Sequence, residues 1–207
     1  MPEARRGKRA PRRQRAPVRT SREEIQEKAV QLFLKKGYHG TSTTDICDAV
    51  GISRPTLYWY FKDKEDILFS LHKQRIEKSF QPITASAKAE PDPVLRLKRF
   101  MADLTGLICT EPESKILIKE TEYLDPEHQE WVVANWKEQF DMLRATISEL
   151  KAAGKARDVS ETFMAFSLLG MITWAYNWFD YARPEGIGRL AANIQDVFLT
   201  GLLKSES

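Results

Sequence analysis

The residues of this sequence best suited to chemistry are an arginine, a threonine and three aromatics within seven positions, Arg54–Tyr60. Ser53 can cap a helix here, and Pro55 fits its first turn, where a missing N–H costs nothing. Leu57 and Phe61 lie four residues apart and face the interior, so the other side chains stay on the helix surface. Such a helix fits the major groove of DNA, where arginine reads guanine and apolar groups contact the thymine methyl. The predicted base-contacting residues are Arg54, Pro55, Thr56, Tyr58 and Trp59, with Tyr60 beside them.

A second short helix must position this stretch. Residues 43–50 are predicted to form it, with Ile46, Ala49 and Val50 on its apolar side. Gly51 ends it, because glycine adopts left-handed backbone without steric cost. The positive N-terminal end of this helix can bind a phosphate through hydroxyl and backbone N–H groups. The predicted phosphate contacts are Thr43 and Thr44.

A known motif is recognisable in residues 43–65, which read Thr-Thr-x6-Gly-Ile-Ser-x-x-Thr-Leu-Tyr-x-Tyr-Phe-x-x-Lys-Glu. This pattern resembles the helix-turn-helix of TetR-family regulators, and the resemblance is firm over residues 21–70. It implies an all-α fold of about nine helices, with a three-helix DNA-binding head and a C-terminal helical domain for ligand binding and dimerisation. The family also has a lysine on the DNA backbone close to the position of Lys64.

Length and charge divide the chain into three parts. The 207 residues include five Trp, six Tyr and ten Phe, enough to bury a core. Residues 1–20 hold eight Arg or Lys against one Glu, a charge of +7, so with a net charge of +3 the remaining residues carry −4. We predict a basic disordered arm over 1–20, a DNA-binding domain over 21–69 and a ligand-binding and dimerisation domain over 70–207. The arm either follows the DNA minor groove or is a solvated tail, and the sequence leaves both open.

Helical spacing and helix-ending residues predict the remaining elements. The first helix starts at Ser21, which has capping-box spacing with the glutamate three residues on, and it ends at Gly37. The fourth helix starts at Asp63 and ends at Pro82, and the composition from Pro82 to Pro93 is typical of a linker. Further helices are predicted over residues 93–110, from Ile116 to near Tyr123, and over 126–153, 163–181 and 188–203.

The last two helices carry more apolar surface than one small domain needs. Paired with the same two helices of a second copy, they would form a four-helix bundle. Their periodicity alone does not distinguish this from an ordinary core. The family resemblance implies a homodimer, which sets two recognition helices one turn of DNA apart on a palindromic operator.

The resemblance also implies a ligand cavity among the middle helices, and such cavities are mostly apolar with a few polar groups. Any single aromatic in this region could equally be ordinary core, and His128 could be an exposed first-turn residue. Residues 168–178, Leu-Leu-Gly-Met-Ile-Thr-Trp-x-Tyr-x-Trp, are similar to a subgroup that regulates fatty-acid, steroid and aromatic catabolism, several of whose members respond to acyl-CoA. The predicted lining is Met101, Thr105, Cys109, Trp131, Trp136, Phe140, Trp174, Asn177 and Trp178, with Thr173, Tyr181 and His128 as further candidates.

These observations predict a DNA-binding transcription regulator, in the simplest case a repressor released by a small hydrophobic or CoA-linked effector. An architectural DNA-binding protein without an effector and an activator of the same fold remain alternatives. The three histidines form no triad, and no Gly-rich phosphate loop follows a strand, so we expect no enzyme. We likewise expect no cofactor and no metal, because no Cys or His has metal-ligand spacing.

The sequence also bears on where the protein works. No apolar run approaches the roughly 20 residues that a membrane span needs, and no apolar stretch of a secretory signal follows the basic N-terminus. Cys47 and Cys109 lie far apart and fit free buried thiols in a reducing compartment. We therefore expect a cytoplasmic protein without a membrane partner.

Overall fold

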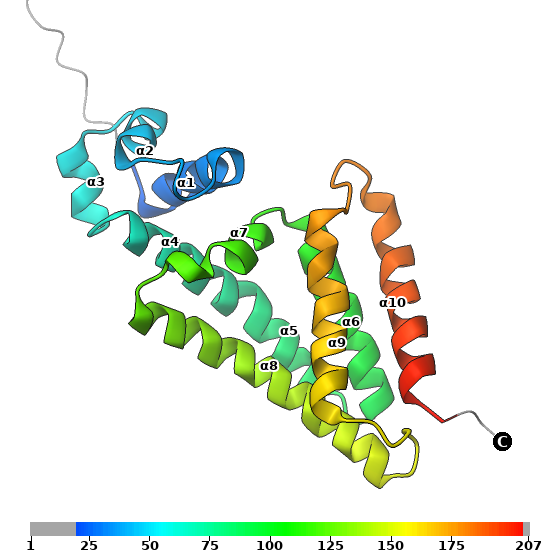
Figure 1. Cartoon of the computed structure of the whole chain (residues 1–207). Coiled ribbons are helices and arrows are strands. Elements are labelled where there is room, and N and C mark those ends of the chain that lie inside the picture. Colours follow the sequence, from blue (N-terminus) through cyan, green and yellow to red (C-terminus); the bar gives the residue numbers. More distant parts are fainter. Residues whose placement is uncertain (1–19, 205–207) are drawn as a thin grey trace, which may run out of the picture.

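The computed structural model describes residues 20–204, and within this range it is helical, with no named β-strand. Figure 1 shows a small head at one end and a larger helical body. Residues 1–19, which include almost all of the predicted arm, lie outside the described range. The α-helices are α1 (Arg22–Lys36), α2 (Thr43–Val50), α3 (Arg54–Tyr60), α4 (Lys64–Arg75), α5 (Gln81–Lys88), α6 (Pro93–Thr110), α7 (Ser114–Lys119), α8 (Pro126–Ala152), α9 (Glu161–Thr173) and α10 (Ile187–Leu202). The shorter segments are the π-helix η1 (Ile76–Phe80) and the 3-10 helices η2 (Thr121–Tyr123), η3 (Trp174–Asn177) and η4 (Pro184–Gly186).

The head is formed by α1, α2 and α3 around a buried apolar core. Ser21 caps α1 by accepting a hydrogen bond from the backbone N–H three residues on, at 3.1 Å. Ser42 caps α2 in the same way, and Gly51 ends it in left-handed backbone with φ of 80°. One prediction is wrong: Ala49 is exposed, and Cys47 is buried in its place. The reason is that α2 packs on both α1 and α3, which shifts its buried face toward Cys47.

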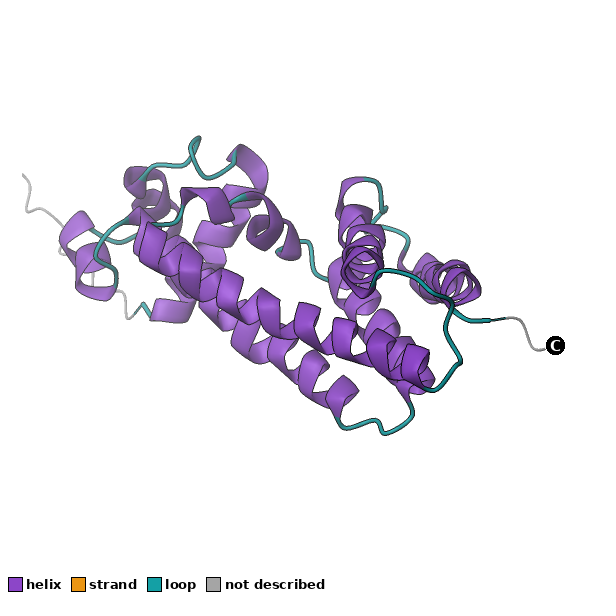
Figure 2. Ribbon diagram, turned by 60° about the horizontal axis from the view of Figure 1, so that its bottom comes forward, coloured by secondary structure: helices purple, strands orange, loops and turns teal. Residues whose placement is uncertain are grey.

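A continuous helical rod of α4, η1 and α5 joins the head to the body and runs alongside α8 (Figures 1 and 2). The prediction that the fourth helix ends at Pro82 is therefore wrong, and so is the predicted linker, because only residues 89–92 separate α5 from α6. A proline inside a helix loses one hydrogen bond and clashes with the preceding turn. The π-helical turn before Pro82 changes the bonding pattern, so that this proline stands at the start of α5. The predicted boundary between residues 69 and 70 falls inside α4 and stays a prediction.

The body is built around α6, which packs against α5, α8, α9 and α10. Its inward side chains are fully buried: Leu97, Phe100, Met101, Leu104 and Ile108. The predicted bounds of α6 and α8 agree with the structure to within a residue. The helix predicted over 163–181 is shorter, because α9 ends at Thr173 and continues as η3. Counted with α4, η1 and α5 as one rod, residues 20–204 have nine α-helices, the number expected.

Within residues 20–204, no helix combines the length and the apolar composition needed to cross a membrane.

His72 of α4 is fully buried, and we predict that it makes stability depend on pH. Its Nδ1–H donates to the carbonyl of Leu68 at 3.0 Å, and burial lowers its pKa from 6.5 to about 4. Between these two values the unfolded chain binds a proton that the folded chain does not. The free energy of unfolding therefore falls as pH falls through this window, by about 3 kcal/mol.

Urea unfolding of the wild type and of His72→Gln between pH 7 and pH 4 measures this contribution. The variant should lose this part of the pH dependence, whereas His39→Gln, at an exposed histidine, should keep it. An unchanged pH dependence in His72→Gln would mean that another group is responsible.

Candidate nucleic-acid interface and effector region

The surface of α3 has the arrangement predicted for a helix that reads DNA. The Ser53 hydroxyl accepts from the backbone N–H of Thr56 at 3.3 Å, so α3 begins at the expected residue. Leu57 and Phe61 are each 1% exposed, while Tyr58 is 50% and Trp59 is 78% exposed. Two large aromatic side chains are thus exposed to solvent on a helix whose opposite side is buried. The predicted contacts Arg54 and Pro55 are exposed as well, and Thr56 is half-buried.

The N-terminal ends of α2 and α3 lie against each other. The Arg54 guanidinium donates to the hydroxyl of Thr44, which brings together a predicted base contact and a predicted phosphate contact. Ser42 and Asp45 form a capping box at the start of α2. A hydrogen bond from Lys36, with others from Ser42, holds the pKa of Asp45 well below its usual value. The capping box uses the amides of Ser42 and Asp45, so those of Thr43 and Thr44 are left for a phosphate.

Two of the predicted DNA contacts also form hydrogen bonds within the protein. The Lys64 ammonium donates to the carbonyls of Tyr38 and Thr41, each at 2.8 Å, and lies 4.0 Å above the Tyr38 ring. Desolvation lowers the pKa of Lys64. The Tyr60 hydroxyl donates to the carbonyl of Thr20 at 2.6 Å. The phosphate contact of Lys64 stays a prediction, and the structure adds that its ammonium binds two carbonyls in the α1–α2 loop.

We predict that Lys64→Ala destabilises the head rather than weakening DNA binding directly. The Thr41 carbonyl loses its donor and the Tyr38 carbonyl keeps only the backbone N–H of Thr41, so the free energy of unfolding should fall by about 1–3 kcal/mol. Urea denaturation measures this, with Lys62→Ala as the control, because Lys62 is exposed. Unchanged stability together with weaker binding to every DNA sequence would instead support the phosphate role.

Sequence analysis missed one residue that holds α3 in place. Arg22 of α1 donates to the carbonyl of Tyr60 at 2.8 Å and lies 4.1 Å over the ring of Phe61. A cation at the negative C-terminal end of a helix is stabilising. No local pattern could have revealed this contact, since Arg22 and Tyr60 are 38 residues apart in sequence.

The predicted ligand-pocket residues separate into three groups. Those on α6, Met101, Thr105 and Cys109, are fully buried. The aromatics on α8 are half-buried against the same core: Trp131, Trp136 and Phe140. Within the described residues, the Thr105 hydroxyl has no hydrogen-bond partner. A buried polar group without a partner costs about 1–3 kcal/mol, so this hydroxyl is suited to a ligand contact.

The other predicted lining residues do not face a cavity. Trp174, Asn177 and Trp178 are exposed, because η3 has three residues per turn and puts Trp174 and Asn177 on one outer face. The further candidates also have partners within the protein. The Tyr181 hydroxyl donates to the Ile108 carbonyl at 3.0 Å, and Thr173 donates to the Leu169 carbonyl at 2.8 Å.

Two hollows of about 500 Å³ lie elsewhere on the described chain. A groove of about 490 Å³ lies between the head and the body, lined by residues of α1, α4 and α7. The second, of about 520 Å³, lies between α6 and α10. Neither is lined by the predicted set, and the ligand pocket at that set stays a prediction.

Large apolar side chains are exposed on α9, on or next to η3, and on α10, and we call this set the apolar face. The helices α9 and α10 lie side by side on the far side of the body from the head (Figure 1), and η3 continues α9. The large side chains of the apolar face are between 57% and 73% exposed. Apolar patches of this kind mark interaction surfaces. The members of this face are Phe163, Phe166, Trp174, Trp178 and Val197.

These features define a class of all-α protein. Its head is a helix-turn-helix that exposes α3, and its body is helical and carries the exposed apolar face. The chain belongs to the TetR family of bacterial regulatory proteins. Residues 25–71 match the family model described as bacterial regulatory proteins, tetR family. Residues 90–202 match the tetracyclin repressor-like C-terminal domain. The predicted fold class and family are thereby confirmed.

Individual relatives are regulators too. The fatty acid metabolism regulator protein of Bacillus subtilis is 33% identical over 87 residues, which is 40% of this chain and 45% of that protein. The transcriptional regulator HbdR of Aromatoleum sp. is 24% identical over 162 residues, which is 78% of this chain and 69% of that one. The matched region spans about half the length of the first curated relatives.

Solved structures match over most of their length. AibR in complex with isovaleryl coenzyme A and operator DNA has a TM-score of 0.78 and 28% identity, covering 85% of this chain and 96% of AibR. PfmR, a TetR family transcriptional regulator from Thermus thermophilus, has a TM-score of 0.79 and 29% identity, covering 91% of this chain and 100% of PfmR.

Proposed function

We propose that this protein is a homodimeric, DNA-binding transcription regulator that represses by occupying a palindromic operator and is released by a hydrophobic or CoA-linked effector. The observation that carries the proposal is the surface of α3. This helix buries only Leu57 of its seven residues and exposes Tyr58 and Trp59. Exposing two large aromatics is unfavourable in water, and a major groove is the surface that fits them.

The proposal includes a division of roles that the geometry of the head supports. Phosphates bound at the amides of Thr43 and Thr44 position the head, and exposed side chains of α3 choose the sequence. A second copy, docked through the apolar face on α9 and α10, brings its own α3 to the next major groove. The cytoplasm is the compartment in which we place this function, and we expect no catalytic activity.

The effector class is supported by two independent observations. AibR, similar over most of its length, was solved with isovaleryl coenzyme A together with operator DNA. In this chain the buried Thr105 hydroxyl is unpartnered among the described residues and lies beside Met101 and Cys109 on α6. An acyl group would fill the apolar region between α6 and α8, and its thioester carbonyl could accept from Thr105.

Release requires that the effector move the head. The rod of α4, η1 and α5 is continuous, so a shift of α5 against α6 and α8 is carried to the base of α3. We propose that the effector favours a position of α4 in which the two heads no longer match one turn of DNA. Reciprocity then requires that operator DNA weaken effector binding by the same factor. An effector that binds equally with and without operator would contradict this mechanism.

The experiment that tests DNA reading selects binding sites from a random DNA library and compares variants on the selected site. The wild type should select a palindrome with half-sites one turn apart. Arg54→Ala should cost about 1–3 kcal/mol on that site and relax the choice at one base, with little change on random DNA. Arg183→Ala, at an exposed arginine in the body, is the control. No selected site, or equal losses for Arg54→Ala on both DNAs, would reject the proposal.

A further inference from the structure

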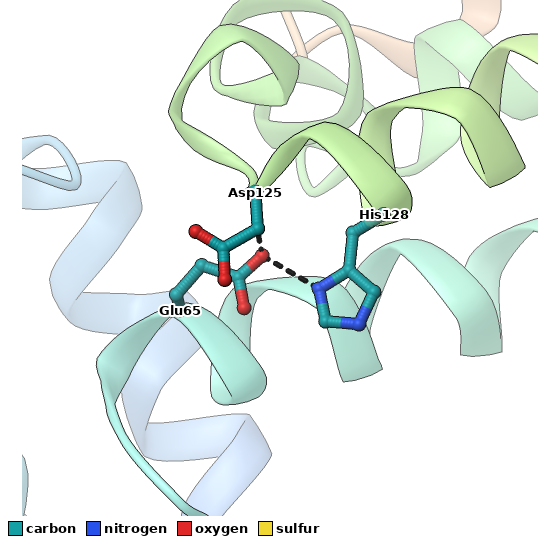
Figure 3. Close-up of side chains that lie close together, drawn as sticks. All are labelled: Glu65, Asp125 and His128. Atoms are coloured by element: carbon teal, nitrogen blue, oxygen red, sulfur yellow. Dashed lines mark hydrogen bonds and ion pairs between the residues drawn. The ribbon is translucent and has the colours of Figure 1, made fainter.

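Two segments far apart in sequence meet where α4 and α8 begin. Glu65 lies in the first turn of α4, Asp125 is the residue before α8, and His128 lies in the first turn of α8. Figure 3 shows the Glu65 carboxylate between the other two side chains. One ligand atom from each residue lies within 4.8 Å of the others.

The hydrogen bonds of this cluster leave one carboxylate unused. Glu65 Oε1 accepts from the backbone N–H of Asp125 at 3.0 Å and binds Nδ1 of His128 at 2.8 Å (Figure 3). Glu65 thereby accepts a hydrogen bond from the backbone at the start of α8, the helix end that the Asp125 side chain would ordinarily cap. The Asp125 side chain forms no cap hydrogen bond, although aspartate before proline is a common helix start.

The imidazole of His128 is held in a fixed plane. The Phe69 ring stacks on it with 3.6 Å between centroids and 7° between planes, and Trp131 packs edge-on against Phe69 at 5.5 Å. The side chains of His128 and Glu65 are 29% and 14% exposed. A fixed, half-buried ring beside two carboxylates loses little conformational freedom when it binds an ion.

We propose that Glu65, Asp125 and His128 bind a divalent transition metal ion of the zinc class, with water completing its coordination. One imidazole and two carboxylates suit Zn²⁺, Co²⁺ or Ni²⁺, and the lack of a thiolate argues against soft Cu⁺. Ligand atoms at about 2.1 Å from a tetrahedral ion are roughly 3.4 Å apart, a spacing that small side-chain rotations can reach.

Binding through Nδ1 replaces the hydrogen bond between His128 and Glu65 by two bonds to the metal. A neutral imidazole then carries its proton on Nε2, and an imidazolium releases one proton to solvent. The carboxylates near the site favour a cation, and the Lys64 ammonium above the Tyr38 ring opposes it. Burial, followed by the negative charges of Glu65, Asp63 and Asp125, raises the pKa of nearby Tyr38 to about 12.

Two positive helix ends oppose the ion. Both α4 and α8 begin at the site, and the helix dipole disfavours a cation there. We therefore expect moderate affinity, with a dissociation constant on the order of 10 µM. Because the ligands come from both α4 and α8, the bound ion ties the helix below the DNA-reading head to the body.

The test uses the full-length protein, freed of metal with a chelator and titrated with Zn²⁺ by calorimetry and with Co²⁺ by visible absorption. We expect one ion to bind per chain. The visible absorption spectrum of the bound Co²⁺ should indicate an ion with a nitrogen ligand. Saturating Zn²⁺ should raise the unfolding temperature by roughly 5 °C. His128→Ala and Asp125→Asn should each weaken binding at least about tenfold.

Asp125→Asn should fold like the wild type, because the Asp125 carboxylate makes no cap hydrogen bond and an amide has the same size. A loss of binding in this variant therefore cannot be attributed to misfolding. His39→Ala is the matched control, an exposed histidine in the head outside the cluster. Binding weaker than about 1 mM, or binding that survives in both site variants, would overturn the proposal. Neither outcome bears on DNA binding, so the metal site and the proposed regulator stand or fall separately.

Discussion

A Phe163→Asp variant is expected to be monomeric and to lose more than about 100-fold in operator affinity. Phe163 is among the most exposed large apolar side chains of the described chain, at 73%, so the change should leave the folded monomer intact. A carboxylate buried in an apolar interface without a partner costs several kcal/mol. A monomer holds only one half-site, and the affinity gained by linking two half-sites is lost.

The measurement combines sedimentation with titration of labelled operator DNA. Val197→Asp changes an exposed apolar side chain of the neighbouring helix α10 and should behave alike. Leu95→Asp is the matched control, because Leu95 is 50% exposed on α6 and does not belong to this face. A wild type that is monomeric at micromolar concentration, or two variants that remain dimers, would show that this face has another purpose.

Phe61→Ala is expected to abolish DNA binding through stability, lowering the free energy of unfolding by about 3–5 kcal/mol. Phe61 is 1% exposed, ends α3, and lies under the Arg22 guanidinium. Its removal leaves a cavity beneath the recognition helix while every exposed side chain of that helix stays in place.

Tyr58→Ala is the matched variant on the outer surface of the same helix. It should leave the free energy of unfolding within about 0.5 kcal/mol of the wild type and still weaken operator binding. Urea unfolding and DNA titration of both variants separate anchoring from reading. Equal destabilisation by both, or a Tyr58→Ala variant with unchanged operator affinity, would contradict this division of α3 into a buried and a reading side.

Residues that act through their immediate neighbours could be predicted from the sequence. Ser53, Gly51 and Leu57 work within one helical turn, and the structure has each of them in the predicted role. Helix caps and left-handed glycines depend on backbone sterics and on hydrogen bonds that span three or four residues. The same local rules failed at Pro82, where a π-helical turn that no local pattern marks lets the rod continue.

The sequence by itself thus determined the fold class, the family and which side of α3 is exposed. Only the tertiary structure decided that Lys64 binds loop carbonyls, that Trp174 faces outward, and that Glu65 meets residues 60 and 63 positions away. The physical reason is that a long side chain can reach several partners, and the packing of distant helices selects among them. Helical periodicity predicts which face of a helix is apolar. It does not predict which helix or which protomer packs on that face, or where side chains from two helices meet to bind an ion.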